Sequence, residues 1–85
     1  MELTIRVNLE EPVMSRQAAD ISSRISEYRS RVLLRRRDTT VNAKSLMGLM
    51  SLGLSSGQAV TILAKGEDEA EAANALAALL GASGA

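Results

Sequence analysis

Two kinds of side chain in this sequence could do chemistry: a serine at the start of a short apolar segment, and carboxylates gathered in two clusters. The serine is Ser45, in the stretch VNAKSLMGLMSLGL. The carboxylates fall at residues 10–11 and 67–71. Carboxylates can act as general acid and base or hold a metal, and a serine can be a nucleophile or a phosphorylation site.

The chain contains neither His nor Cys, and this excludes most of that chemistry. A Ser–His or Cys–His nucleophile needs a histidine, and a transition-metal site made of carboxylates alone is disfavoured. The cluster at 67–71 comes directly before an alanine-rich segment that is expected to be a helix. Acidic residues are favoured in the first turn of a helix, because their charge complements the helix dipole. We therefore expect a protein that is not an enzyme and has no catalytic residues, metal or cofactor.

The composition sets further limits. The chain has 85 residues, 46% of them hydrophobic, which suits a single domain over residues 1–85. Ten Lys and Arg balance ten Asp and Glu, so bulk charge does not favour nucleic acid or an anionic membrane. No apolar run approaches the roughly 18 residues that a transmembrane helix needs. The absence of Cys makes a cytoplasmic location the expectation.

Hydrophobic periodicity predicts four strands and three helices. A period of two marks strands at 3–9, 31–37, 40–43 and 60–64, with a tight turn at Asp38-Thr39. Helical spacings mark a helix that Ser15 caps and that extends to Tyr28, a short helix at 46–52, and one at 70–80 that stops at Gly81. Because each strand has one apolar face, we expect an α+β fold of order β-α-β-β-α-β-α, with helices on one face of a mainly antiparallel sheet.

The short helix at 46–52 carries more large apolar residues than one of its faces can bury. At about 100° per residue, Leu49 and Leu52 form one stripe, which suits the core. The second stripe consists of Leu46, Met47 and Met50. This second stripe is either an exposed partner surface rich in adaptable Met, or it is covered by a neighbouring loop or a dimer contact.

Ser45 also has two interpretations. It can be only the N-cap of this helix. It can also be a phosphorylation site, because the free N–H groups and the positive dipole end of a helix favour a phosphate. A phosphoserine would add about −1.5 to −2 charges beside the second stripe without melting the helix.

The stretches VNAKSLMGLMSLGL and GEDEAEAANALAALL, together with the order of the elements, resemble the HPr family, the small phosphocarriers of the bacterial sugar phosphotransferase system. The resemblance covers nearly the whole chain. It implies an open-faced β-sandwich, with a four-stranded sheet and three helices on one side. It also implies that Ser45 corresponds to the regulatory serine of the family.

The active-site loop departs from the family motif Gly-Ile-His-Ala-Arg-Pro-Ala. This chain reads PVMSRQA at residues 12–18. Met14 therefore replaces the phosphoacceptor histidine, Gln17 replaces the proline, and Arg16 keeps the arginine. Since Met14 cannot carry a phosphoryl group stably, the resemblance does not extend to phosphoryl relay. The pattern is similar to the catabolite-repression branch of the family, which lacks the histidine and keeps the serine.

That branch implies a regulatory role. An HPr kinase/phosphorylase would modify Ser45, and the product would bind a LacI-type catabolite repressor. Leu46, Met47 and Met50 would be partner contacts, and Arg16 would lie near the phosphoserine. The alternative is a degenerate paralogue that binds its partner constitutively, with the serine only as a cap. We expect a monomer or weak dimer that does not bind nucleic acid or membranes directly.

Two features remain outside this interpretation. The run Arg35-Arg36-Arg37 is either a nucleic-acid contact, as in a small RNA-binding domain, or a solvated strand end. The second is favoured because no aromatic platform accompanies the arginines. Leu33, on the polar face of its strand, is either a dimer contact or an ordinary exposed leucine.

Overall fold

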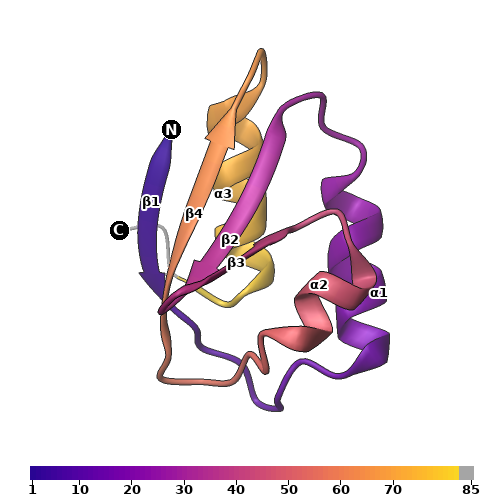
Figure 1. Cartoon of the computed structure of the whole chain (residues 1–85), viewed down its shortest axis with the longest axis vertical. Helices are drawn as coiled ribbons and strands as arrows, with labels where there is room; N and C mark the ends of the chain where they lie inside the picture. Colours follow the sequence, from indigo (N-terminus) through magenta and orange to yellow (C-terminus); the bar gives the residue numbers. More distant parts are fainter. Residues whose placement is uncertain (83–85) are drawn as a thin grey trace.

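The computed structural model describes residues 1–82, and its elements follow the predicted order (Figure 1). They are β1 (Glu2–Arg6), α1 (Ser15–Ile25), β2 (Arg31–Arg36), β3 (Thr39–Asn42), α2 (Leu46–Ser51), β4 (Ala59–Lys65) and α3 (Glu69–Leu79). The small residues at 82–85 predict a frayed tail, and all of them except Ala82 lie outside the described residues.

The four strands form one sheet in the order β1-β4-β2-β3, and every neighbouring pair is antiparallel. The N-terminal strand thus pairs with the last strand, and β3 forms the opposite edge. The three helices lie on one side of this sheet and leave the other side uncovered (Figure 1). The predicted α+β class, the open-faced sandwich and the mainly antiparallel sheet are confirmed.

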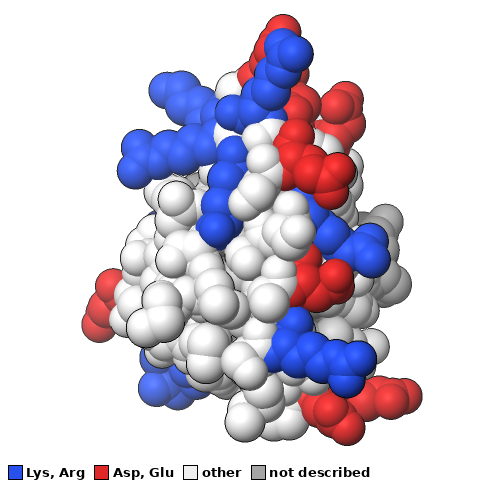
Figure 2. All heavy atoms as spheres, turned by 90° about the vertical axis from the view of Figure 1, so that its right-hand side faces the viewer, with Lys and Arg blue, Asp and Glu red and all other residues white. Residues whose placement is uncertain are grey.

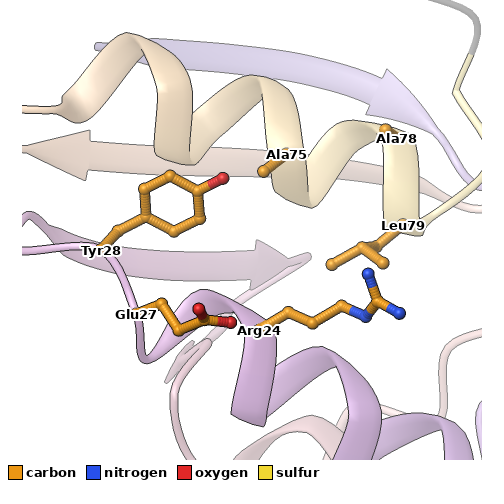
Figure 3. Close-up of a pocket in the computed structure, with 6 residues that line it drawn as sticks. All are labelled: Arg24, Glu27, Tyr28, Ala75, Ala78 and Leu79. Carbon is orange, nitrogen blue, oxygen red and sulfur yellow. The ribbon is translucent and has the colours of Figure 1, made fainter.

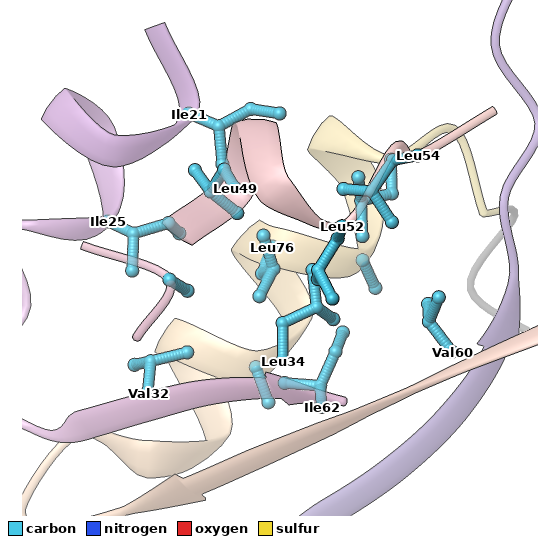
Figure 4. Close-up of a cluster of buried hydrophobic side chains, with 14 of the residues drawn as sticks. Ile21, Ile25, Val32, Leu34, Leu49, Leu52, Leu54, Val60, Ile62 and Leu76 are labelled. Atoms are coloured by element: carbon cyan, nitrogen blue, oxygen red, sulfur yellow. The ribbon is translucent and has the colours of Figure 1, made fainter. Parts of the chain in front are cut away.

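The core lies between the sheet and the helices (Figure 4). Alternate residues of the strands face it, among them Val32 and Leu34 of β2 and Val60 and Ile62 of β4, all of them buried. The helices contribute Ala18, Ile21 and Ile25 of α1, Leu49 of α2, and Ala72, Ala73, Leu76 and Ala77 of α3. Branched aliphatic side chains and alanines fill this space, which aromatic rings fill in many other cores.

Helix α1 begins one residue away from the predicted cap. Met14 occupies the N-cap position in extended backbone, and Ser15 is the first helical residue, so the prediction that Ser15 caps the helix is wrong. The amide N–H of Met14 donates to Oε1 of Gln17, three residues along, at 3.2 Å. This is one half of a capping box, and it shows that a side chain inside the first turn organises the helix start. The helix also ends at Ile25, before Tyr28.

The β2–β3 turn differs from the prediction by one residue. Arg36 pairs with Thr39, so the two turn residues are Arg37 and Asp38, with Arg37 at φ 55°. This register places Val41 opposite Leu34, where Val41 packs against the core. The turn that joins these paired strands holds Arg37 in left-handed backbone.

Gly81 ends α3 as predicted and also meets another part of the chain. Its φ is +80°, which follows the usual glycine stop of a helix. A Cβ at this position would lie 1.8 Å from the carbonyl oxygen of Asn8. The amide N–H of Asn8 donates to the carbonyl oxygen of Leu80 at 2.9 Å, so the segment after β1 is held against the end of α3.

Candidate functional site

Ser45 is the N-cap of α2. Its backbone is extended, and its Oγ accepts a hydrogen bond from the amide N–H of Gly48 at 3.1 Å. Its carbonyl oxygen accepts from the N–H of Leu49 at 3.0 Å, the first bond of the helix. The sequence-based prediction of a serine cap is therefore confirmed, and the hydroxyl satisfies a donor that the helix start would otherwise leave free.

Gly48 allows α2 to lie close to β3. A Cβ on this glycine would lie 3.1 Å from Cβ of Val41 and 3.4 Å from the carbonyl oxygen of Asn42. Both are tight contacts, so a larger residue would move the helix away from the strand. The close approach fixes the position of Ser45 and of the side chains that follow it.

The two stripes of α2 have different environments. Leu49 is fully buried and Leu52 is 4% exposed, as expected for the core stripe. The second stripe is exposed: 39% for Leu46, 76% for Met47 and 42% for Met50. We call Leu46, Met47 and Met50 the α2 patch. Figure 2 looks onto the side where α1 and α2 lie, and there a broad uncharged area runs down the middle, with charged side chains above and along one side. The structure thus leaves the second stripe uncovered by any described loop.

The loop before α1 lies next to the segment after α2. The N–H of Val13 donates to the carbonyl oxygen of Leu54 at 2.8 Å. Met14 follows directly and is 65% exposed. A residue at this position is thus presented to solvent at the start of a helix, which is a suitable place for a group that must meet a partner protein.

Two basic side chains that the sequence analysis did not single out as positioning groups hold α2 in place. Nη1 of Arg36 donates to the carbonyl oxygen of Leu52 at 3.0 Å, at the end of α2. Nζ of Lys44 donates to the carbonyl oxygen of Tyr28 at 2.7 Å, which connects the segment before α2 to the turn that follows α1. Neither contact has a local sequence signal, because each partner is a backbone carbonyl 16 residues away.

Arg16 lies in the first turn of α1 and is exposed. It lines an open hollow of about 580 Å³ toward α3, together with Leu9, Gln17, Asp20, Ile21 and Leu79. Gln17 is therefore shared between this hollow and the N–H of Met14. Among residues 1–82, Arg16 forms no ion pair, so its guanidinium is free to meet an anion.

A second hollow, of about 530 Å³, lies between α1 and α3 (Figure 3). It is lined by Arg24, Glu27, Tyr28, Ala75, Ala78 and Leu79. The Tyr28 ring and the Leu79 side chain are seen on the α3 side of the opening, and Arg24 and Glu27 come from the α1 side. The hollow is open and carries both signs of charge, so it has no group that singles out one ligand.

The acidic cluster at 67–71 lies at the start of α3, as the sequence predicted, although the Asp68 side chain accepts no hydrogen bond from the helix itself. Asp68 is the N-cap residue, and Glu69 and Glu71 lie in the first turn. Hydrogen bonds from the Ser30 hydroxyl and from the N–H groups of Arg29 and Ser30 lower the pKa of Asp68 to about 2. A hydrogen bond from the amino group of Met1, at 2.6 Å, likewise lowers the pKa of Glu69.

Two other classes of site are absent from the described part of the chain. Residues 1–82 contain no group of three or more carboxylates placed to hold a metal ion. None of the helices among these residues combines the length and the apolar character needed to cross a bilayer. The α2 patch with Ser45 and the neighbouring start of α1 is therefore the strongest candidate site in this part of the chain.

The whole described chain also resembles known proteins. Residues 1–82 match the family model described as the PTS HPr component phosphorylation site. The chain is 45% identical over 74 residues to the HPr-like protein Crh of Bacillus subtilis (strain 168), which covers 87% of each chain.

Solved structures show the same fold. A phosphocarrier protein HPr from Bacillus anthracis superimposes with a TM-score of 0.89 at 34% identity, over 94% of this chain and 95% of that one. The crystal structure of Bacillus subtilis Crh gives a TM-score of 0.75 at 41% identity, over 89% and 90% of the chains. That Crh structure is described as an intertwined dimer with a swapping domain.

Proposed function

Because the chain belongs to the HPr family, we propose that it is a regulatory member that acts by binding other proteins, in carbon catabolite regulation, and that it does not relay phosphoryl groups. In this proposal residues 1–85 form one HPr-like domain that works in the cytoplasm and catalyses no reaction.

The observation that carries this proposal is the replacement of the phosphoacceptor. The chain has no histidine, and Met14 stands exposed at the start of α1 where the resemblance places the family histidine. A thioether is only a weak hydrogen-bond acceptor and offers no nitrogen to form a phosphoramidate. Gln17 replaces the family proline and binds the backbone of Met14, so the loop is also organised differently.

Ser45 is the proposed regulatory site. Its hydroxyl already lies at the first-turn N–H groups of α2, at 3.1 Å from the nitrogen of Gly48. A phosphate on this hydroxyl would accept the same N–H groups, and its charge would complement the end of the helix dipole. Modification by an HPr kinase/phosphorylase would therefore add charge beside the α2 patch and keep the fold.

The α2 patch is the proposed docking surface for a LacI-type catabolite repressor. Leu46, Met47 and Met50 supply apolar contact area, and the flexible Met side chains adapt to a partner. Arg16, free of ion pairs within residues 1–82, is the proposed second contact, close to the phosphate in the complex. The functional form is a monomer or weak dimer.

The alternative is a paralogue that binds its partner without phosphorylation. The observation in its favour is that Ser45 already has a structural task as the cap of α2. In that case the α2 patch is still the docking surface, and only the switch is missing.

Both possibilities can be separated with one experiment. The protein is incubated with an HPr kinase and ATP, the added phosphate is located by mass spectrometry, and repressor binding is measured before and after. We expect one phosphate on Ser45 and tighter repressor binding. Ser45→Ala should abolish both effects, and Ser51→Ala, a change of a nearby exposed serine in the same helix, should abolish neither. An unmodified Ser45, or a phosphate without effect on affinity, would contradict the switch.

A further inference from the structure

The open face of the sheet, opposite the helices, carries its own pattern of side chains (Figure 1). Strand residues alternate between the two faces, so the neighbours of the core residues point outward. The outward positions are Glu2, Thr4 and Arg6 of β1, Ala59, Thr61, Leu63 and Lys65 of β4, Arg31, Leu33 and Arg35 of β2, and Thr40 and Asn42 of β3.

Positive charge dominates this face although the whole chain is neutral. Four of its outward residues are basic and Glu2 is the only acidic one. Arg31 lies directly opposite Lys65 on the neighbouring strand, an arrangement of like charges that costs stability. Among residues 1–82, neither side chain has an ion-pair partner within 4.0 Å. The fold therefore places two cations side by side, and the carboxylates of Glu2 and Glu69 line the same open groove without an ion pair to either of them.

An apolar pair lies next to these cations. Leu33 of β2 is paired with Leu63 of β4, and both are half-buried. Along β2, Leu33 is flanked by Arg31 and Arg35 on the same face. Arg31, Leu33, Leu63 and Lys65 line an open groove of about 570 Å³. The groove is also lined by Met1, Ala64 and the two carboxylates Glu2 and Glu69, whereas Arg35 lies on the same face of the sheet beside it.

Arg35 and Arg36, two neighbours in the arginine run at 35–37, point to opposite faces of the sheet. Arg35 points to the open face, whereas Arg36 points to the helix side and binds the carbonyl oxygen of Leu52. The cationic set on the open face, Arg31, Arg35 and Lys65, is instead assembled from two strands that are about 30 residues apart in sequence.

We propose that this face binds an extended segment of a protein partner in which acidic and aliphatic residues alternate. Its aliphatic side chains would contact Leu33 and Leu63, and its carboxylates would meet the guanidinium groups of Arg31 and Arg35 and the ammonium group of Lys65. A single-stranded nucleic acid fits less well, because no aromatic residue occupies an outward position on which a base could stack.

This site is separate from the proposed function. Helix α2 lies on the covered side of the sheet (Figure 1), whereas Arg31, Leu33, Leu63 and Lys65 point to the uncovered side, so the two partners can bind at the same time. Loss of repressor binding would leave the groove intact, and the converse also holds.

The test uses the full chain and a labelled synthetic peptide in which Glu and Leu alternate. Amide chemical shifts are followed by NMR during titration. We expect shifts at Arg31, Leu33, Arg35, Leu63 and Lys65, unchanged signals in α2, and affinity that falls with added salt. A peptide with Gln in place of Glu should not bind.

Two double variants with the same change in net charge separate the site from bulk charge. Arg31→Gln with Lys65→Gln should weaken peptide binding roughly three- to tenfold without lowering the thermal midpoint, because a like-charge pair is removed. The control, Arg24→Gln with Arg29→Gln, removes two exposed cations outside the sheet and should leave binding unchanged.

Four results with added peptide or oligonucleotide overturn the proposal. They are the absence of peptide binding, shifts confined to the α2 patch, equal weakening in both double variants, and tighter binding of a single-stranded oligonucleotide than of the peptide. Shifts on this face that depend on protein concentration without peptide would identify a second copy of the chain as the occupant and would also overturn it.

Discussion

Asp68 and Ser30 bind each other reciprocally across the sheet end, 38 residues apart. Oδ1 of Asp68 accepts from the N–H of Ser30 at 2.9 Å and from its hydroxyl at 2.5 Å, and the hydroxyl accepts from the N–H of Asp68 at 3.1 Å. This contact joins the start of α3 to the start of β2. Gly66 passes so close that a Cβ there would lie 2.7 Å from Ser30, so the arrangement leaves no room for a larger residue.

The first prediction is a pH dependence of stability. Because the pKa of Asp68 is lowered to about 2 from an ordinary value of 3.8, its carboxylate stabilises the folded chain above the ordinary value. That contribution is lost as the pH falls from 3.8 toward 2. Asp68→Asn should lower the free energy of unfolding at neutral pH and narrow its difference from wild type in this acidic range, as measured by urea unfolding. Parallel curves for the two proteins would contradict the prediction. Glu69, whose pKa is also lowered, is present in wild type and in Asp68→Asn and contributes to the acid sensitivity of both proteins.

The second prediction concerns the cap of α2. Ser45→Ala should lower the free energy of unfolding by roughly 0.5–2 kcal/mol, because the N–H of Gly48 loses its acceptor. Ser45→Asp should retain the fold, since aspartate also caps helices, and should imitate phosphate poorly, with one charge. Thermal unfolding of both variants and of Ser51→Ala checks this. An unaltered midpoint for Ser45→Ala would show that the cap contributes nothing.

The third prediction separates the stripes of α2. Met47→Asp should leave stability nearly unchanged and weaken repressor binding, because the side chain is exposed. Leu49→Ala should cost about 2–5 kcal/mol, because it opens a cavity in the core. Chemical denaturation and a binding assay provide the comparison. Unfolding of Met47→Asp would mean that the exposed stripe has a structural role.

The fourth prediction concerns phosphoryl relay. Incubation with phosphoenolpyruvate and enzyme I should leave no acid-labile phosphate on the chain, because it has no histidine. Met14→His should restore transfer only poorly, because Gln17 continues to hold the backbone at this position. Both outcomes are measured as the radiolabelled phosphate that each protein retains after treatment with acid and with alkali. Near-normal transfer in the single variant would show that the loop geometry is still competent.

The fifth prediction compares two glycines with positive φ. Gly53→Ala should cost about 1–2 kcal/mol, the strain of a left-handed alanine, because open space surrounds the position. Gly81→Ala should cost distinctly more, because its Cβ would collide with Asn8. Equal thermal midpoints for the two variants would refute the close approach of α3 to the segment after β1.

Much of the candidate site was accessible from local patterns. The spacing of Leu49 and Leu52 relative to Leu46, Met47 and Met50 predicted two stripes and assigned the first to the core, which its burial confirms. The spacing left the exposure of the second stripe open, and the structure shows this stripe exposed. The cap at Ser45 was predicted from residue type and position alone. The roles of these residues, and of Met14, Arg16 and Gln17, in phosphorylation and partner binding stay predictions.

Other features required the folded chain. The cap of α1 was misplaced because Ser15 has the usual residue type, whereas the backbone places the extended residue at Met14 and lets Gln17 reach back. The turn after β2 was displaced by one residue because the pairing extends to Arg36 and Thr39, and the residue types around Asp38 do not reveal this register.

The sequence by itself determined the order of the elements, the faces that they bury and the absence of histidine, because periodicity and residue chemistry are local properties of the chain. Only the tertiary structure decided which distant groups meet. Strand pairing and helix docking bring together Asp68 and Ser30, Arg36 and Leu52, Gly81 and Asn8, and Arg31 and Lys65. Such contacts depend on how the whole chain packs around its core, so they cannot be predicted from a short stretch of the sequence.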